Sequence, residues 1–194
     1  MSVDAFLAAY PPQTPRAPYV PPEADEPSLA LGPHLTALLE RAGAGLHADG
    51  MLQLVDPRAY LDDYLAFFGG DAGGRVPFML NGFGEVIAYK RIGVRQDEIS
   101  ILHTYGPKLA VLAHDLGDFF DCVLLTDDGL RDVINVPLYR QVRSARRRLR
   151  PGEVYGFDPN LLAEEGEGAK ADARYFEVVD AREHLSLLLR RAEG

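Results

Sequence analysis

The spacing of apolar residues along the chain predicts where helices lie. Apolar positions three or four residues apart are typical of a helix that buries one side. Asp56 and Pro57 mark one helix start, because Asp is a favoured N-cap and Pro suits the first helical position. The expected helices cover residues 3–9, 33–42, 57–68, 116–125, 137–150 and 181–191, and Asp127 with Asp128 is expected to cap another short helix.

Shorter alternating or continuous apolar runs predict strands. The expected strands cover residues 51–55, 75–80, 85–91, 99–105, 109–113, 154–157 and 175–180. Asn81 and Gly82 stand between two of these runs, where they favour a tight hairpin. Because strands and helices are largely segregated, the sequence predicts an α+β fold with an antiparallel or mixed β-sheet and helices packed mainly on one face.

Proline content divides the chain into two parts. Residues 11–27 hold seven of the 14 prolines, together with Glu23, Asp25 and Glu26. Such a stretch favours extended backbone and offers little to bury. We therefore expect residues 1–27 to form a Pro-rich N-terminal arm that can be deleted without unfolding the protein. Residues 28–194 are expected to form a single α+β domain.

The chain is acidic, with a net charge of −9, and its positive charge is concentrated in residues 140–150, which contain six arginines and no acid. An acidic protein repels nucleic acid and attracts basic partners. The arginine run lacks the interleaved aromatic residues of a nucleic-acid patch. We interpret it as a solvated face or as an intramolecular partner for acidic groups, with contact to an acidic protein or nucleic acid as the alternative.

Several features indicate a protein of the cytoplasm that does not enter a membrane. No apolar run approaches the roughly 20 residues that a membrane helix needs. Residues 1–10 include Asp4 and no basic segment, so we expect no signal peptide. The single cysteine, Cys122, lies among apolar residues and is expected to be buried, and one cysteine fits a reducing compartment.

Motifs for catalysis are not found. The pair Gly82 and Gly84, followed by Lys90, lacks the third glycine of a kinase loop, and neither a Walker A pattern nor a Gly-x-Ser-x-Gly turn occurs. No two histidines have the spacing of a helical metal site; they are His34, His47, His103, His114 and His184. We expect a protein that is not an enzyme, with no catalytic residue, no cofactor and no metal site.

Exposed acidic groups are the candidates for contact with a basic partner, because such charges speed association and set specificity. The first candidates lie in a charge-dense, glycine-containing loop and are Glu164, Glu165 and Glu167. The second candidates are two adjacent pairs, Asp62 with Asp63 and Asp127 with Asp128. Neighbours on a helix point about 100° apart, so neither pair shares a proton. All seven could also be plain solvated groups.

Four segments in order resemble the GAD-like immunity proteins that are linked to type VI secretion DNase toxins. They are 49–57 (DGMLQLVDP) with Tyr60, 82–85 (GFGE), 152–157 (GEVYGF) followed by Pro159 and Leu161, and 179–185 (VDAREHL). The resemblance covers about residues 38–194. The chain departs from the family in having no tryptophan and in a charged segment at 162–168.

The resemblance implies an immunity protein that binds and neutralises a cognate secreted antibacterial toxin, such as a nuclease effector, by occluding it. The alternative is an intracellular regulatory or assembly module of the same fold without a toxin partner. The resemblance assigns no functional residue, because the shared segments have a structural character. The glycine between Tyr155 and Phe157, for example, indicates a strand that another part of the chain approaches closely.

Overall fold

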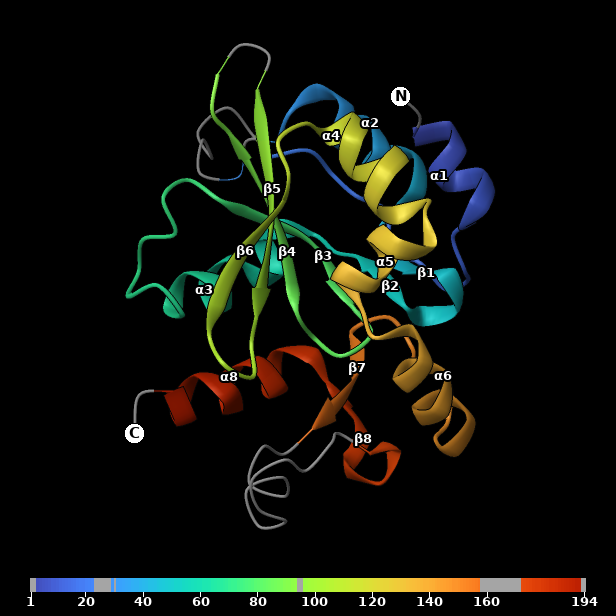
Figure 1. Ribbon diagram of the computed structural model, residues 1–194. Coiled ribbons are helices and arrows are strands. Elements are labelled where there is room, and N and C mark those ends of the chain that lie inside the picture. The colour runs from blue at the N-terminus through green and yellow to red at the C-terminus, as the bar shows by residue number, and fades with distance from the viewer. Residues whose placement is uncertain (1–2, 23–28, 30, 94–95, 158–171, 193–194) are drawn as a thin grey trace.

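The computed structural model describes residues 3–22, 29, 31–93, 96–157 and 172–192 (Figure 1). It confirms an α+β fold built on a six-stranded antiparallel sheet, in the order β1-β2-β3-β4-β5-β6, beside an antiparallel pair, β7-β8. The strands are β1 Gly45–His47, β2 Leu52–Leu54, β3 Val76–Asn81, β4 Val86–Arg91, β5 Asp97–His103, β6 Lys108–Ala113, β7 Glu153–Phe157 and β8 Phe176–Asp180. The helices are α1 Val3–Ala9, α2 Pro33–Ala42, η2 Ala48–Gly50, α3 Pro57–Ala66, α4 Leu116–Asp118, the π-helical η3 Phe119–Leu124, α5 Asp127–Val133, α6 Val136–Ala145, η4 Ala173–Tyr175 and α8 Ala181–Ala192.

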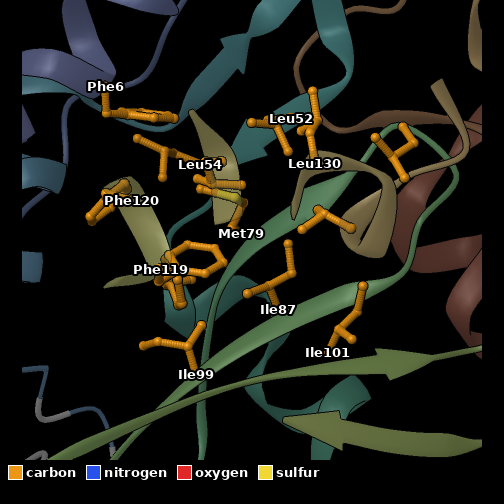
Figure 2. Close-up of a cluster of buried hydrophobic side chains, with 14 of the residues drawn as sticks. Phe6, Leu52, Leu54, Met79, Ile87, Ile99, Ile101, Phe119, Phe120 and Leu130 are labelled. Atoms are coloured by element: carbon orange, nitrogen blue, oxygen red, sulfur yellow. The ribbon is translucent and has the colours of Figure 1, made fainter. Parts of the chain in front are cut away.

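Successive side chains of a strand point to opposite sides of a sheet. The central strands β3, β4 and β5 bury side chains on both faces, whereas the edge strand β6 is partly exposed. Ile87 and Tyr89 of β4 join the larger core cluster, whereas Val86 and Ala88 join the smaller one. The larger cluster takes in residues of α1, α2, η3, α5 and α6, and the smaller takes in α3 and α8. Figure 2 shows Phe6, Phe119 and Phe120 of the larger cluster beside side chains of the sheet such as Leu54 and Met79. Most helices thus cover one face, as predicted.

Helix α3 begins where the N-cap and proline signals of the sequence predict it. The Asp56 carboxylate accepts a hydrogen bond from the backbone N–H of Arg58 at 3.0 Å, and Pro57 occupies the first helical position. Tyr60 and Tyr64, four residues apart, are buried against the sheet. This helix closes the second face of the sheet together with α8.

The N-terminal segment is part of the fold, in contrast to the removable arm expected from residues 1–27. Phe6 is fully buried in the larger cluster, with its ring centroid 5.1 Å from that of Phe120. Ala17 pairs with Ala44 through two backbone hydrogen bonds of 2.8 Å beside the edge of β1. The prolines favour the extended backbone that this pairing needs. The described part of the arm, residues 3–22, therefore belongs to the domain.

Two further predictions are wrong for local reasons. Cys122 is exposed, because η3 turns Phe119, Phe120 and Leu124 towards the core and leaves the cysteine outside. The helix expected over 137–150 ends at Ala145, and the next residue is extended.

The arginines around the end of α6 are held by groups of the same chain. The guanidinium of Arg146 donates to the carbonyl oxygens of Phe176 and Arg174 at 2.6 and 3.0 Å. Arg147 forms two hydrogen bonds of 2.7 Å to the carboxylate of Glu153. The intramolecular interpretation therefore holds for these arginines, and their bonds fix the extended chain that leads into β7.

The turn between β3 and β4 is wider than the expected two-residue hairpin. The Asn81 side chain closes it by accepting from the backbone N–H groups of Phe83 and Glu85 at 3.0 and 3.1 Å. Its amide also donates to the carbonyl oxygen of Val133 at 2.6 Å, which ties the turn to α5. The positive φ of this turn falls at Gly84, with φ 85°, rather than at the Asn-Gly pair.

Candidate partner-binding groove

The four sequence segments 49–57, 82–85, 152–157 and 179–185 lie next to one another in space. Segment 82–85 is joined to 49–57 and to 152–157, and segment 152–157 is joined in turn to 49–57 and 179–185. The bonds are Gly82 N–H to Met51 O (2.8 Å), Tyr155 N–H to Gly82 O (2.9 Å), Gly152 N–H to Gln53 Oε1 (2.7 Å) and Ala181 N–H to Gly152 O (2.8 Å). We call this contact region the seam.

Glycines make the seam possible. A Cβ on Gly82 would lie 2.3 Å from the Tyr139 ring and 2.9 Å from the carbonyl oxygen of Gly50. A Cβ on Gly156 would lie 2.4 Å from the Val179 side chain. Distances this short exclude a side chain unless neighbours move, so these two glycines are required for packing.

The polar side chains of the seam bond to one another. Tyr105 donates to the carbonyl oxygen of Phe83 at 3.1 Å, and its hydroxyl lies 3.0 Å from Nε2 of the buried His184. Glu85 lies 2.7 Å from Nδ1 of His103. Burial raises the pKa of Tyr105 above its ordinary value. These contacts hold the 81–85 turn against α8, which is a positioning task.

Beside the seam the surface carries two open pockets, an apolar part and a polar part, which we together call the groove. The apolar part encloses about 230 Å³ and is lined by Ala17, Ala44, Gly45, Gln53, Leu54, Val55, Asp56, Ala59, Tyr60, Pro151 and Gly152. The polar part encloses about 690 Å³ between α3 and α8 and is lined by Asp63, Asp180, Arg182, Glu183, Ser186 and Arg190. Most of these residues belong to, or directly follow, the four segments.

Tyr60 links the two parts of the groove. Its ring lines the apolar part, and its hydroxyl is close enough to Asp180, Arg182 and Asp63 of the polar part for their charges to act on it. Burial raises the pKa of Tyr60 to about 12, and the Asp180 carboxylate adds to the rise. The hydroxyl therefore stays neutral well above the pH at which a free tyrosine ionises.

We expect this tyrosine to make folding sensitive to alkali. Its pKa is raised on folding from 10.0 to about 12, so its contribution to stability is fully present below pH 10 and is lost as the pH rises towards 12. Between these values the free energy of unfolding should fall more steeply in the wild type than in Tyr60→Phe, by up to about 1.4 kcal/mol per pH unit. Urea unfolding at a series of pH values measures the difference, and parallel curves for the two proteins would contradict the assignment.

Gln53 is the unusual residue of the apolar part, and sequence reasoning missed it. It lies on β2 between two buried leucines and is 3% exposed. Its Oε1 accepts from Gly152, but among the described residues its Nε2 has no hydrogen-bond partner. The sequence did contain a signal, because Gln53 is a polar residue in the middle of an otherwise apolar strand. In an alternating strand such a residue would face solvent, whereas here it is buried.

The acidic residues predicted from the sequence are not brought together. Asp63 lines the polar part of the groove and pairs with Arg182 at 2.7 Å, and Asp62 beside it is exposed. Asp127 and Asp128 are exposed in the first turn of α5. Because α3 and α5 pack against opposite faces of the sheet, the two pairs belong to different surfaces. Glu164, Glu165 and Glu167 lie outside the described residues.

Searches of the described residues for two other kinds of site gave no candidate. Within these ranges no group of three or more His, Cys, Asp or Glu side chains is placed to hold a metal ion. None of the described helices combines the length and apolar character needed to cross a membrane.

Comparison with known proteins adds a fold relationship. No family model matches the chain, and no curated protein matches it. Among solved structures, the crystal structure of Atu4351 from Agrobacterium tumefaciens superposes with a TM-score of 0.67 at 13% sequence identity, covering 100% of this chain and 90% of that one. The two proteins share a fold. At this identity the likeness concerns the fold alone.

Proposed function

We propose that this protein is an immunity protein, which binds a cognate secreted antibacterial toxin in the cytoplasm and neutralises it by occlusion. One observation carries the proposal. The four segments that resemble the GAD-like immunity proteins are spread over more than a hundred residues of sequence, yet they meet at the seam, and three of them (49–57, 152–157 and 179–185) line the two pockets beside it. A nuclease effector is the class of toxin that the resemblance favours.

Charge supports a basic partner. The net charge is −9, and the polar part of the groove presents Asp180 and Glu183 beside the Asp63–Arg182 pair. Acidic groups around a binding surface raise the rate at which a basic protein arrives, and salt weakens that effect. The protein then acts by contact, and the proposal assigns it no catalytic step.

The association rate tests the position of the surface. We expect the double variant Asp62→Asn with Glu183→Gln to associate with the product of the adjacent gene, which the immunity function predicts to be a toxin, about threefold to tenfold more slowly at low salt. Most of that difference should be lost at about 500 mM salt. The matched control, Asp127→Asn with Asp128→Asn, removes the same charge from the opposite face. Surface-binding kinetics at two salt concentrations give both rates.

Each outcome of this experiment is informative. A slower rate for the groove variant alone supports the proposal. A slower rate for the α5 variant alone would move the interface to the other face of the sheet. No binding of the wild-type protein to that toxin would contradict the immunity function and favour the regulatory or assembly module.

A further inference from the structure

We propose that residues 3–17 form an acid-sensitive strap, which protonation of His47 releases from the edge of the large sheet. The strap belongs to the fold of this chain, so the proposal does not rest on the proposed function. Two sets of contacts support it, those that attach the strap to β1 and those that bury the His47 ring beneath it.

The strap lies along β1, the first strand of the six-stranded sheet, on the side away from β2. The backbone N–H of Gln13 donates to the carbonyl oxygen of Leu46 at 2.9 Å, and Ala17 and Ala44 exchange two hydrogen bonds of 2.8 Å. The three prolines of the strap have no N–H to add. So few backbone bonds are typical of a segment that opens separately from the core.

His47 lies beneath the strap as a neutral ring. It is fully buried, and the ring of Phe6 packs against it with centroids 5.4 Å apart. Its Nδ1 lies 2.7 Å from the carbonyl oxygen of Tyr10 and therefore carries the proton, because a carbonyl oxygen only accepts. Nε2 is buried and has no hydrogen-bond partner among the described residues. A proton added there would create a buried, charged donor without an acceptor, which is costly.

The charges around the ring do not offset that cost. Among the described residues, the charge that acts on His47 is the cation of Arg16. The acids of the neighbouring elements, Asp4 of α1 and Asp49 of η2, form ion pairs with arginines at 2.8 and 2.5 Å. Burial lowers the pKa of His47 below its ordinary value of 6.5, the hydrogen bond to Tyr10 offsets this in part, and Arg16 adds to the lowering.

Acid therefore favours the open strap. Once the strap opens, His47 reaches water and regains its ordinary pKa of 6.5, so the open form binds a proton more tightly than the closed form. The preference for the closed form is fully present above pH 6.5 and is lost as the pH falls below it, by up to about tenfold in the open-to-closed ratio for each pH unit. Opening also takes Ala17 out of the wall of the apolar part of the groove.

Hydrogen exchange of the full-length protein tests the strap. We expect the protection factors of the Ala17 and Ala44 backbone amides to fall about tenfold to thirtyfold from pH 7 to pH 5. In His47→Asn the fall should be less than about twofold, because an asparagine amide donates to the Tyr10 carbonyl oxygen without titrating. The matched control, His34→Asn, changes an exposed histidine of α2 and should respond as the wild type does.

Two further measurements need no substitution, and they decide the question if His47→Asn does not fold. Proton NMR of the histidine rings should give His47 a titration midpoint below 6.5 and below that of the exposed His34. The exchange of the Ala17 amide should depend on urea less steeply than that of Ile87 in the central strand β4, because a local opening exposes less surface than complete unfolding.

Four results would overturn the proposal. They are an unchanged protection of the strap amides in the wild type, an equal fall in His47→Asn, a His47 midpoint at or above 6.5, and the same urea dependence for Ala17 and Ile87. The second would assign the acid response to other groups, and the last would show that the strap opens only with the whole protein. Because no toxin enters these experiments, their failure leaves the proposed function standing.

Discussion

Replacing Phe6 with alanine is expected to lower the free energy of unfolding by about 3–5 kcal/mol, the usual range for a fully buried phenylalanine. The ring packs between Phe120, with centroids 5.1 Å apart, and His47, with centroids 5.4 Å apart. It also lies edge-on to Tyr10. The change would leave a cavity that these aromatic neighbours cannot fill by a small shift. Urea unfolding followed by circular dichroism measures the loss.

A variant in the same helix separates this effect from a general weakness of the N-terminal segment. Ala9→Ser alters an exposed position of α1 and should change the free energy of unfolding by no more than about 0.5 kcal/mol. If Phe6→Ala were as mild as this control, the segment would be a removable arm after all, as its proline content alone suggests.

Gly82→Ala is expected to cost about 3 kcal/mol or more, at the upper end of what overpacking causes. The added methyl group would lie 2.3 Å from the Tyr139 ring and 2.9 Å from the Gly50 carbonyl oxygen. The ring has little freedom to retreat, because the Tyr139 hydroxyl donates to the carbonyl oxygen of Asp49 at 3.0 Å. The strain would fall on the seam that joins the four segments.

Gly106→Ala is the matched control for this change. Nothing lies within 4 Å of the Cβ position at Gly106, and its φ, like that of Gly82, is not positive. We expect an effect within about 0.5 kcal/mol for the control. Equal losses of unfolding free energy in Gly82→Ala and Gly106→Ala would show that the close contacts of Gly82 are not the reason why a side chain is excluded there.

Much of the fold follows from local signals in the sequence. Asp56 and Pro57 begin α3 where the cap and proline preferences place its start, and the period of apolar residues predicts its buried tyrosines. The short strand β1, Gly45–His47, was missed because the glycines at 43 and 45 indicate the end of the preceding helix. The burial of Phe6 was missed because the prolines that follow it indicate an extended arm, and a single aromatic residue gives no periodic pattern.

The groove was beyond prediction for a different reason. Its walls are made by contacts such as that between Gln53 and Gly152, which are 99 residues apart in the sequence. No local pattern reports such a pairing. The two aspartate pairs singled out by charge are separated by the fold, since α3 and α5 cover opposite faces of the sheet. Charge identifies candidate contacts, whereas the topology decides which of them share a surface.

The most direct test of the proposed function is co-expression with the product of the adjacent gene, which the proposal predicts to be a toxin, in a susceptible bacterium, scored by growth. We expect the wild-type chain to restore growth, Gly82→Ala to restore it poorly because the fold is weakened, and Gly106→Ala to behave as the wild type. Growth arrest in the presence of well-expressed wild-type protein, with no complex recovered from those cells, would contradict the immunity function.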